Sequence, residues 1–361
     1  MRLFYASGSL IPSDRANSVH VMKMCQAFAK NGCDVTLFAK RGGCENPFDF
    51  YGVDSIFSYV FSPFKNGIFR LVDQAYQFLK LPKPDICYGR DPWLLVWMSL
   101  FCPVVLELHE VPSGLQGKVV KWLFLKSKTK LIVCISKSLL SDVLTFLGTL
   151  NEERFVVAHD GADVHENVTV GILKSVKPSV GYVGSLLPGK GAEVLVDLAA
   201  RMPEISFHIV GGSRQQIDEL RVREKGGDVH YHGHVSHGDL NKYLSGFDVV
   251  VAPYQKDMSL RTGVNILRWI SPLKLFEYMA AKKPIICSDL SVLREVMEHE
   301  KNCLLVAPDN LDEWQNAITR LVNDEALKVR LSDQALADLK EHYTWDKRAK
   351  NILGAVTKAL M

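Results

Sequence analysis

The chain has 361 residues, which is more than one hydrophobic core usually supports, so we expect two domains of ordinary size. Its composition, 47% hydrophobic and 23% charged, is typical of a packed globular protein and excludes a disordered or fibrous class. A formal net charge of +3 is too weak to indicate a nucleic-acid-binding protein.

Short apolar runs alternate with longer amphipathic segments through the first half of the chain. Helices are predicted at about residues 18–31, near Trp93 and at 118–127. Pro92 to Leu106 is too short for a membrane-spanning helix, and it predicts a buried helix followed by a buried strand. The alternation favours a parallel sheet with helices on both faces. The predicted strands are LFYAS, DVTLFAK, DICYG, PVVLELH, LIVCIS and FVVAHDG.

The hydrophobic pattern lapses at about residues 166–178 and then repeats. We therefore predict an N-terminal domain at 1–165, a linker at 166–178, a second domain at 179–340, and a C-terminal helix at 341–361 that could cross back to the first domain. The predicted fold class is α/β, with two Rossmann-like doubly wound domains facing a central cleft. The strands predicted for the second domain are SVGYVGS, SFHIVGG, VHYHGHV, DVVVAPY, PIICSD and CLLVAP, with a helix after each.

A glycine-rich turn, Gly184 to Gly191, separates the first strand of the second domain from its helix. It matches the first seven positions of a phosphate-binding P-loop, but Gly191 stands where a magnesium-binding Ser or Thr is required. Backbone N–H groups at the helix start and the charge of Lys190 still suit an anionic ligand. The alternative is a plain turn with a solvated lysine.

A second candidate is the start of the helix SPLKLFEYMAA. Ser271 followed by Pro272 favours a helix start with free N–H donors, and Glu277 lies in its first turns. Such an end can bind phosphates while an ionised carboxylate accepts hydrogen bonds from ribose hydroxyls. The alternative is an ordinary surface glutamate.

These motifs together resemble the retaining family-four glycosyltransferases of the GT-B fold. The resemblance rests on GYVGSLLPGKG, VHYHGHVSHGDLNKYLSGFDVVVAPY, SPLKLFEYMAAKKPIICSD and YTWDKRAKNIL in the second half. In the first half it rests on the Gly8 loop, NSVHVMKMCQAFAKNGCDVTLF, VVLELHE and LIVCISKS. It implies an acceptor-binding first domain and a donor-binding second domain.

The resemblance also implies roles for single residues. Lys190 would contact the diphosphate, Glu277 the ribose, and the backbone at Leu273 the β-phosphate. His109 would lie near the transferred sugar, and Gly8 would approach the diphosphate. The implied catalytic residues are His109, Lys190 and Glu277, and the implied donor-binding residues are Gly8, Ser185, Gly189, Lys190, His234, Val235, Arg261, Arg268, Ser271, Leu273, Lys274 and Glu277.

Two positions depart from the family pattern. Trp269 stands where a second glutamate would contact the donor sugar, and Ser185 stands where an arginine often follows the strand glycine. Arg261 or Arg268 could supply the missing positive charge.

The implied activity is that of a metal-independent hexosyltransferase that retains anomeric configuration and serves polysaccharide biosynthesis. It would move a sugar from a UDP- or GDP-sugar to a glycan, lipid-linked or small-molecule acceptor, with no cofactor beyond that co-substrate. Two alternatives stay open: a sugar-nucleotide epimerase or phosphorylase on the same fold, and an inactive donor-binding subunit.

Three further expectations concern metals and location. His230, His232 and His234 would share one face of a strand, near His237, but no carboxylate or cysteine completes a metal site, so we expect none. Scattered cysteines and the absence of a leader pattern predict a cytoplasmic protein. The segment 118–130 combines apolar and basic residues, which suits either an anionic membrane surface at the inner face or, more simply, a solvated helix.

Overall fold

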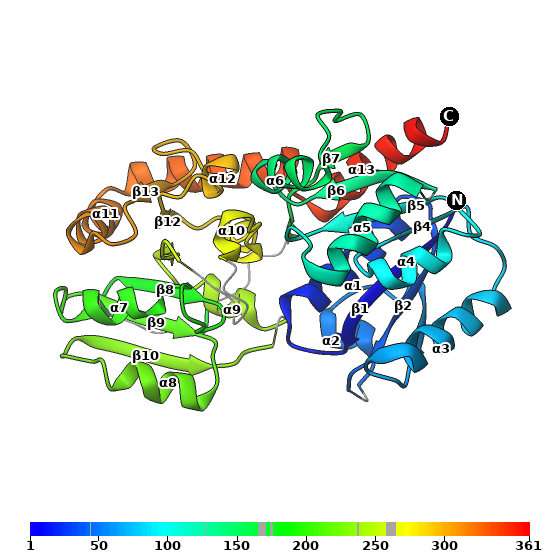
Figure 1. Ribbon diagram of the computed structural model, residues 1–361. Helices are drawn as coiled ribbons and strands as arrows, with labels where there is room; N and C mark the ends of the chain where they lie inside the picture. The colour runs from blue at the N-terminus through cyan, green and yellow to red at the C-terminus, as the bar shows by residue number, and fades with distance from the viewer. Residues whose placement is uncertain (44, 127, 165–170, 174–175, 237, 258–264) are drawn as a thin grey trace. The chain divides into compact units, whose positions relative to one another are not determined.

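The computed structural model describes residues 1–361 except 44, 127, 165–170, 174–175, 237 and 258–264. The chain forms two compact units, drawn in Figure 1. Unit 1 contains Met1–Asp160 and Trp345–Met361, and unit 2 contains Gly161–Thr344. The first unit therefore ends at Asp160 rather than at residue 165, and the chain returns to it at Trp345. Part of the predicted linker lies outside the described residues.

Unit 1 has, within its described residues, a seven-stranded parallel sheet of order β3-β2-β1-β4-β5-β6-β7. The strand order reverses between β1 and β4, which is where open α/β sheets bind their ligands. The strands are β1 (Arg2–Ile11), β2 (Asp34–Arg41), β3 (Ser58–Ser62), β4 (Ile86–Gly89), β5 (Val104–Leu108), β6 (Thr129–Cys134) and β7 (Phe155–Val157).

Some helices of unit 1 begin or end at residues with recognisable capping chemistry. Asp91 accepts hydrogen bonds from two backbone N–H groups of the helix that Pro92 begins. Ser136 caps another helix, which ends at Gly148 in the left-handed conformation. The helices are α1 (Ala16–Lys30), α2 (Pro47–Tyr51), α3 (Gly67–Lys80), α4 (Pro92–Met98), α5 (Gly114–Lys126), α6 (Lys137–Leu147) and α13 (Trp345–Leu360).

The C-terminal helix α13 packs against α1 and β6 in unit 1. It buries Trp345, Ile352 and Val356, and also the charged Arg348. A charged side chain inside a core requires a partner. That partner is described with the site below.

Unit 2 is built on a six-stranded parallel sheet of order β10-β9-β8-β11-β12-β13, counted over its described residues. Its strands are β8 (Ser179–Val183), β9 (Ser206–Val210), β10 (Asp228–Gly233), β11 (Val249–Ala252), β12 (Ile285–Ser288) and β13 (Leu304–Val306). Its helices are α7 (Ala192–Ala199), α8 (Arg214–Arg221), α9 (Leu240–Leu244), α10 (Leu273–Ala280), α11 (Leu311–Asn323) and α12 (Glu325–His342). The helix predicted between β12 and β13 is only a short 3-10 turn, Leu293–Glu295.

The predicted class, two Rossmann-like doubly wound α/β units, is confirmed by the two sheets and their strand order. In the part of the chain that the structure describes, none of the helices combines the length and apolar character that crossing a bilayer requires.

Candidate active site

In unit 2, glycine is required at defined points of the loop between β8 and α7. Gly184 follows β8 with φ 145°, and Gly191, the N-cap of α7, has φ 82°. A Cβ atom at Gly191 would lie 1.7 Å from the carbonyl oxygen of Pro253, so only glycine fits. The turn holds Lys190 with its Nζ 5.1 Å from the centre of the Tyr254 ring.

A second lysine, Lys274 on the first turn of α10, lies against the same ring. Its Nζ is 5.0 Å from the centre of the Tyr254 ring and 3.8 Å from that of Tyr182. It is buried and has no hydrogen-bond partner among the described residues. A Cβ at Gly184 would lie only 3.0 Å from this Nζ. A larger residue at position 184 would therefore crowd the lysine side chain.

The two lysines are desolvated, and the charge of Lys190 raises the cost of charging Lys274. Burial lowers the pKa of Lys190 to about 8. Burial and the charge of Lys190 lower the pKa of Lys274 well below its ordinary value, although the Glu277 carboxylate opposes this shift. Two such cations, held near aromatic rings, are stabilised by an anion that contacts both. An anion beside the half-buried Lys190 would also lower the cost of charging the enclosed Lys274.

The start of α10 differs from the prediction in one detail. The N-cap is Pro272 rather than Ser271, and no side-chain hydrogen bond caps the helix. The backbone N–H groups at Leu273 and Lys274 belong to the unsatisfied first turn of a helix, where anions bind favourably. Glu277 lies one turn later and is half-buried.

The other predicted donor residues lie at varied places in unit 2. Gly189 is in the lysine turn with φ 82°, and Ser185 is exposed, while its carbonyl oxygen accepts a hydrogen bond from the Tyr182 hydroxyl at 2.7 Å. Arg268 ends a short 3-10 helix, Ile266–Arg268, and is exposed. His234 and Val235 directly follow β10, and Trp269, which departs from the family pattern, is buried. Arg261 lies outside the described residues.

The histidines of β10 stack rather than converge on a metal site. The rings of His230 and His232 both stack on His208 of β9, with centroids 4.7 and 5.3 Å apart. The strand ends at Gly233, so His234 does not continue the face that we predicted, and His237 lies outside the described residues. Burial, with smaller contributions from the other two histidines, lowers the pKa of His208 to about 4.

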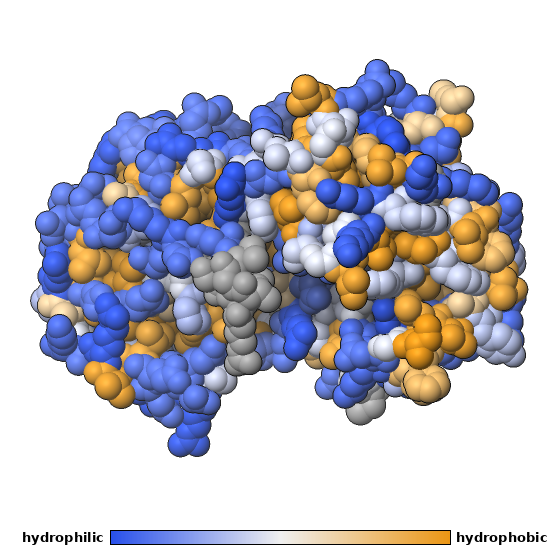
Figure 2. Space-filling model, viewed as in Figure 1, coloured by the Kyte–Doolittle hydropathy of each residue, from blue (hydrophilic) through white to orange (hydrophobic). Residues whose placement is uncertain are grey.

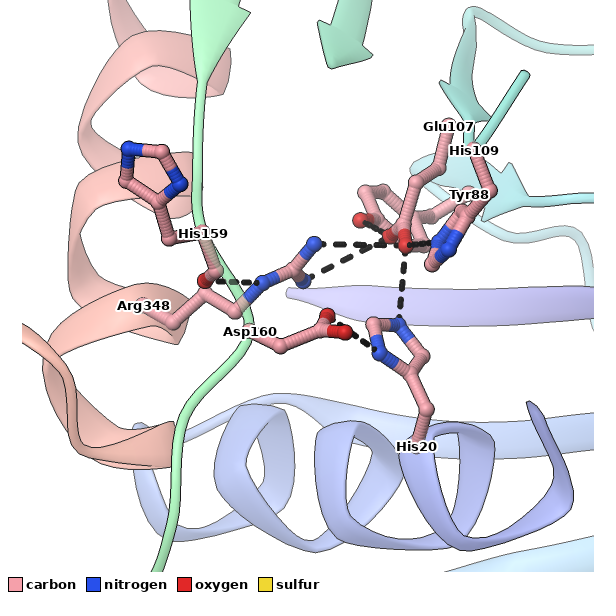
Figure 3. A network of polar contacts seen from close by, with 7 residues as sticks. All are labelled: His20, Tyr88, Glu107, His109, His159, Asp160 and Arg348. Atoms are coloured by element: carbon pink, nitrogen blue, oxygen red, sulfur yellow. Dashed lines mark hydrogen bonds and ion pairs between the residues drawn. The ribbon is translucent and has the colours of Figure 1, made fainter. Parts of the chain in front are cut away.

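In unit 1, Glu107 of β5 lies at the centre of a buried polar network, shown in Figure 3. Its Oε1 is 2.8 Å from His20 Nε2, 2.5 Å from His109 Nε2 and 3.2 Å from Arg348 Nη2. Its Oε2 accepts a hydrogen bond from the Tyr88 hydroxyl. The network therefore joins α1, two neighbouring strands and the C-terminal helix.

The network determines the charge of Glu107. Burial alone would raise the pKa of its carboxyl group, but the charges of Arg348 and His20 outweigh burial and hold that pKa well below its ordinary value. Asp160 extends the network by contacting His20 Nδ1 at 2.9 Å. An ionised Glu107 is a hydrogen-bond acceptor only.

The half-buried His109 directly follows β5, where the prediction places it. Burial lowers its pKa to about 4; the nearby Arg90 guanidinium adds to this shift, and Glu107 opposes it. At neutral pH the imidazole is therefore neutral. Its Nε2 donates to Glu107 Oε1, which leaves Nδ1 as a hydrogen-bond acceptor.

The ligand atoms of His20, Glu107 and His109 all lie within 4.8 Å of one another, and such a set could hold a transition metal. However, the Arg348 guanidinium lies 3.2 Å from the same Glu107 oxygen that would bind the ion. A metal there would face a fixed cation at close range. These residues fit a hydrogen-bonded ion cluster better than a metal site.

Gly8 lies within β1 rather than in a loop, at a point where the pairing of β1 with β2 shifts register between Ala6 and Leu10. A Cβ at Gly8 would lie 3.4 Å from an oxygen of Asp91, which is an ordinary contact, so Gly8 lies beside Asp91 at the carboxyl end of β4. Asp91 is held by Arg70 of α3, whose Nη1 is 2.5 Å from its Oδ2.

Sequence reasoning missed most of the unit 1 network. Tyr88 and Asp160 carry no motif, and although His20 and Arg348 lie inside segments that resemble the family, no role was predicted for either. One signal was present: Glu107 is a single charge inside the otherwise apolar run VVLEL. A charge at that position must find a buried partner.

Comparisons with known proteins extend over both units. The family described as Glycosyltransferase Family 4 matches residues 18–166, and the one described as Glycosyl transferases group 1 matches residues 177–324. An uncharacterized glycosyltransferase of Methanocaldococcus jannaschii is 27% identical over 63% of this chain and 60% of its own length. The alpha-D-kanosaminyltransferase of Streptomyces kanamyceticus is 25% identical over 44% of this chain and 40% of its own length.

Solved structures agree on the fold. A sucrose-phosphate synthase from Thermosynechococcus elongatus superposes with a TM-score of 0.77 at 17% identity, covering 100% of this chain and 99% of that one. Anabaena HepE in complex with UDP-glucose superposes with a TM-score of 0.74 at 16% identity, covering 99% and 100%. With two family models matching in order along two Rossmann-like units, the chain belongs to the group 1 glycosyltransferases and has their GT-B fold.

Proposed function

We propose that this protein transfers a sugar from a nucleotide diphosphate to an acceptor hydroxyl. The observation that carries the proposal is the lysine pair of unit 2, in which two desolvated cations lie beside an uncapped helix start. A bound diphosphate places negative charge near both lysine side chains. Glu277 then binds the ribose, as an acceptor for its hydroxyls.

The lysine pair also accounts for the chemical step. The bond from the anomeric carbon to the phosphate oxygen breaks, the acceptor oxygen forms the new bond, and its proton passes to the departing phosphate. Negative charge grows on the β-phosphate, where Lys190, Lys274 and the N–H groups of α10 stabilise it. We propose that the reaction is metal-independent, that it retains the anomeric configuration, and that His109 contacts the transferred sugar.

The comparisons support the kind of donor. HepE has been solved with UDP-glucose, which favours a UDP-sugar here, with a GDP-sugar as the second choice. The match to the first relative spans 60% of that relative's length, so the activity and substrates of this chain are proposed from its own residues. The acceptor is a glycan, a lipid-linked sugar or a small molecule.

A ligand screen tests the donor site. We expect UDP, GDP or their sugars to raise the melting temperature of the protein in EDTA, because a ligand that binds only the folded state stabilises it. Lys190→Ala should remove this effect, whereas Lys225→Ala, an exposed lysine of the same unit, should not. A shift that appears only with magnesium would contradict the metal-free site, and no shift with any nucleotide would contradict the donor site itself.

An assay of donor turnover separates the candidate activities. Slow release of free nucleoside diphosphate without acceptor supports a transferase, because water replaces the acceptor. An epimerised donor would indicate an epimerase instead. Donor binding without turnover, in the presence of every acceptor class, would indicate an inactive donor-binding subunit.

A further inference from the structure

Helix α3 of unit 1 presents its apolar face to solvent. Five large hydrophobic side chains on it are between 55% and 69% exposed. Successive residues of a helix are about 100° apart, so these five positions lie within about 100° of its circumference. A stripe of this width normally faces a core. The exposed residues are Ile68, Phe69, Val72, Tyr76 and Leu79.

The opposite face of α3 is buried and largely polar. Arg70 donates to Asp91 at 2.5 Å and to the Gln74 side chain at 2.9 Å. Gln74 in turn donates to the Ala39 carbonyl at 3.2 Å. Rolling the helix to bury its apolar stripe would break this buried ion pair and expose Phe78. The stripe therefore needs a partner outside unit 1.

Positive charges lie at the edges of the stripe. Lys65 precedes the helix, Lys80 ends it and Lys83 follows, and all three are exposed. Lys80 Nζ lies 4.1 Å above the Tyr76 ring, so its charge is at the border of the apolar surface. Among residues 67–80 the one acidic side chain is Asp73, on the flank of the helix.

Figure 2 shows hydrophobic side chains gathered where Figure 1 places α3. Phe64 extends this surface beyond the start of the helix, with its ring centre 6.0 Å from that of Phe69. We call Phe64, Lys65 and the exposed residues of α3 up to Lys80 the α3 surface. It combines an apolar centre with a cationic edge.

We propose that the α3 surface binds to an anionic lipid bilayer. Its apolar side chains enter the boundary between headgroups and acyl chains, and the lysines keep their charged ends among the lipid phosphates. A second copy of this chain fits less well, because a symmetric contact would bring the lysine edges of both copies together without acidic partners. Binding of this kind does not depend on sugar transfer.

The location has one consequence that rests on the proposed function. Arg70 ties α3 to Asp91 at the carboxyl end of β4, beside Gly8. That edge of the sheet is where unit 1 would meet an acceptor. A bilayer at the α3 surface therefore favours an acceptor carried by a lipid.

Co-flotation with vesicles tests the binding without any substrate. The full chain should float with vesicles of phosphatidylcholine and phosphatidylglycerol, less so at high salt, and not with phosphatidylcholine alone. The double variant F69S/V72S should reduce partitioning by about tenfold or more, because it removes the inserted apolar groups. Lys65→Ala and Lys80→Ala should each reduce it by about fivefold, equivalent to about 1 kcal/mol per lysine.

A matched control lies on α5. Leu115 lies in the first turn of α5 and Leu125 near its end, and both are about as exposed as the α3 residues. This helix overlaps the lysine-rich segment 118–130. The variant L115S/L125S should bind vesicles like the unchanged protein, and circular dichroism should show all variants folded. If L115S/L125S lost vesicle binding while F69S/V72S kept it, the proposal would be overturned and α5 would be the membrane-binding helix.

Two other outcomes would also overturn it. The first is no flotation with anionic vesicles. The second is a concentration-dependent dimer that F69S/V72S abolishes, which would assign the surface to a second copy. Nucleotide binding, measured separately, keeps a failure here distinct from a failure of the proposed transferase.

Discussion

Replacing Arg348 by methionine removes the cation that neutralises a buried carboxylate. Arg348 Nη2 lies 3.2 Å from Glu107 Oε1, its Nε donates to the His159 carbonyl at 3.0 Å, and both side chains are almost fully buried. Methionine keeps the apolar stem but not the guanidinium group, so the change removes the charge and the hydrogen bond to the His159 carbonyl. Breaking a buried ion pair from one side costs about 3–5 kcal/mol. Because His20 and Tyr88 still contact Glu107, we expect about 3 kcal/mol.

A double-mutant cycle isolates the cause. Glu107→Gln removes the negative charge, so R348M/E107Q leaves no isolated ion in the core, and we expect it to be more stable than R348M by about 1–2 kcal/mol. Because the two units can unfold separately, hydrogen exchange should be followed in peptides of β5 and α13, which report unit 1. Peptides of unit 2 should exchange as before.

The control is Asn351→Ala on the same helix. Asn351 contacts the Val157 carbonyl at 3.5 Å and is exposed, so its loss should change the free energy of unfolding by no more than about 0.5 kcal/mol. A free energy of unfolding of R348M within about 1 kcal/mol of that of the unchanged protein would refute this expectation. A double variant as unstable as the sum of both single changes would refute it equally.

Four further predictions concern single residues. Lys274→Met should raise the melting temperature without ligand, because it removes a desolvated cation, and should weaken nucleoside diphosphate binding in calorimetry by about tenfold or more. Glu277→Ala should weaken nucleotide-sugar binding by about 1.5–3 kcal/mol in the same titration while the fold survives. His109→Ala should lower kcat strongly but leave melting temperature and affinity for the bare nucleotide nearly unchanged, as expected for a contact made in the transition state. The pKa of His208 is about 4 in the folded chain, against an ordinary value of 6.5, so the unfolded state gains a proton first as pH falls. The melting temperature should therefore decline between pH 6.5 and about 4. The decline should be less steep in His208→Phe.

Each of these expectations has a contradicting result. A Lys274→Met protein that melts earlier and still binds diphosphate would place the lysine in the core rather than the site. Unchanged donor affinity in Glu277→Ala would rule out the ribose role. An early-melting His109→Ala protein with near-normal turnover would make that histidine structural, and an unaltered pH profile in His208→Phe would assign the decline to other groups.

The sequence by itself determined the architecture and the glycine-rich turn that carries Lys190. Alternating apolar runs predicted both parallel sheets, because strands buried on both faces need nearly continuous hydrophobic residues. The spacing of glycines around Lys190 predicted its turn, since only glycine adopts the backbone angles found at Gly189 and Gly191 at little cost. These constraints are local, so the residues adjacent in the sequence are enough to predict them.

Only the tertiary structure decided which distant charges meet. Glu107 and Arg348 lie 241 positions apart in the sequence. Lys190 lies in the turn after β8 and Lys274 on α10, yet both side chains lie near the Tyr254 ring. Helix α3 makes the same point, because its periodicity defines an apolar stripe but not the direction in which the stripe faces. The buried contact between Arg70 and Asp91 decides that direction, and the two residues belong to elements whose packing no local pattern encodes.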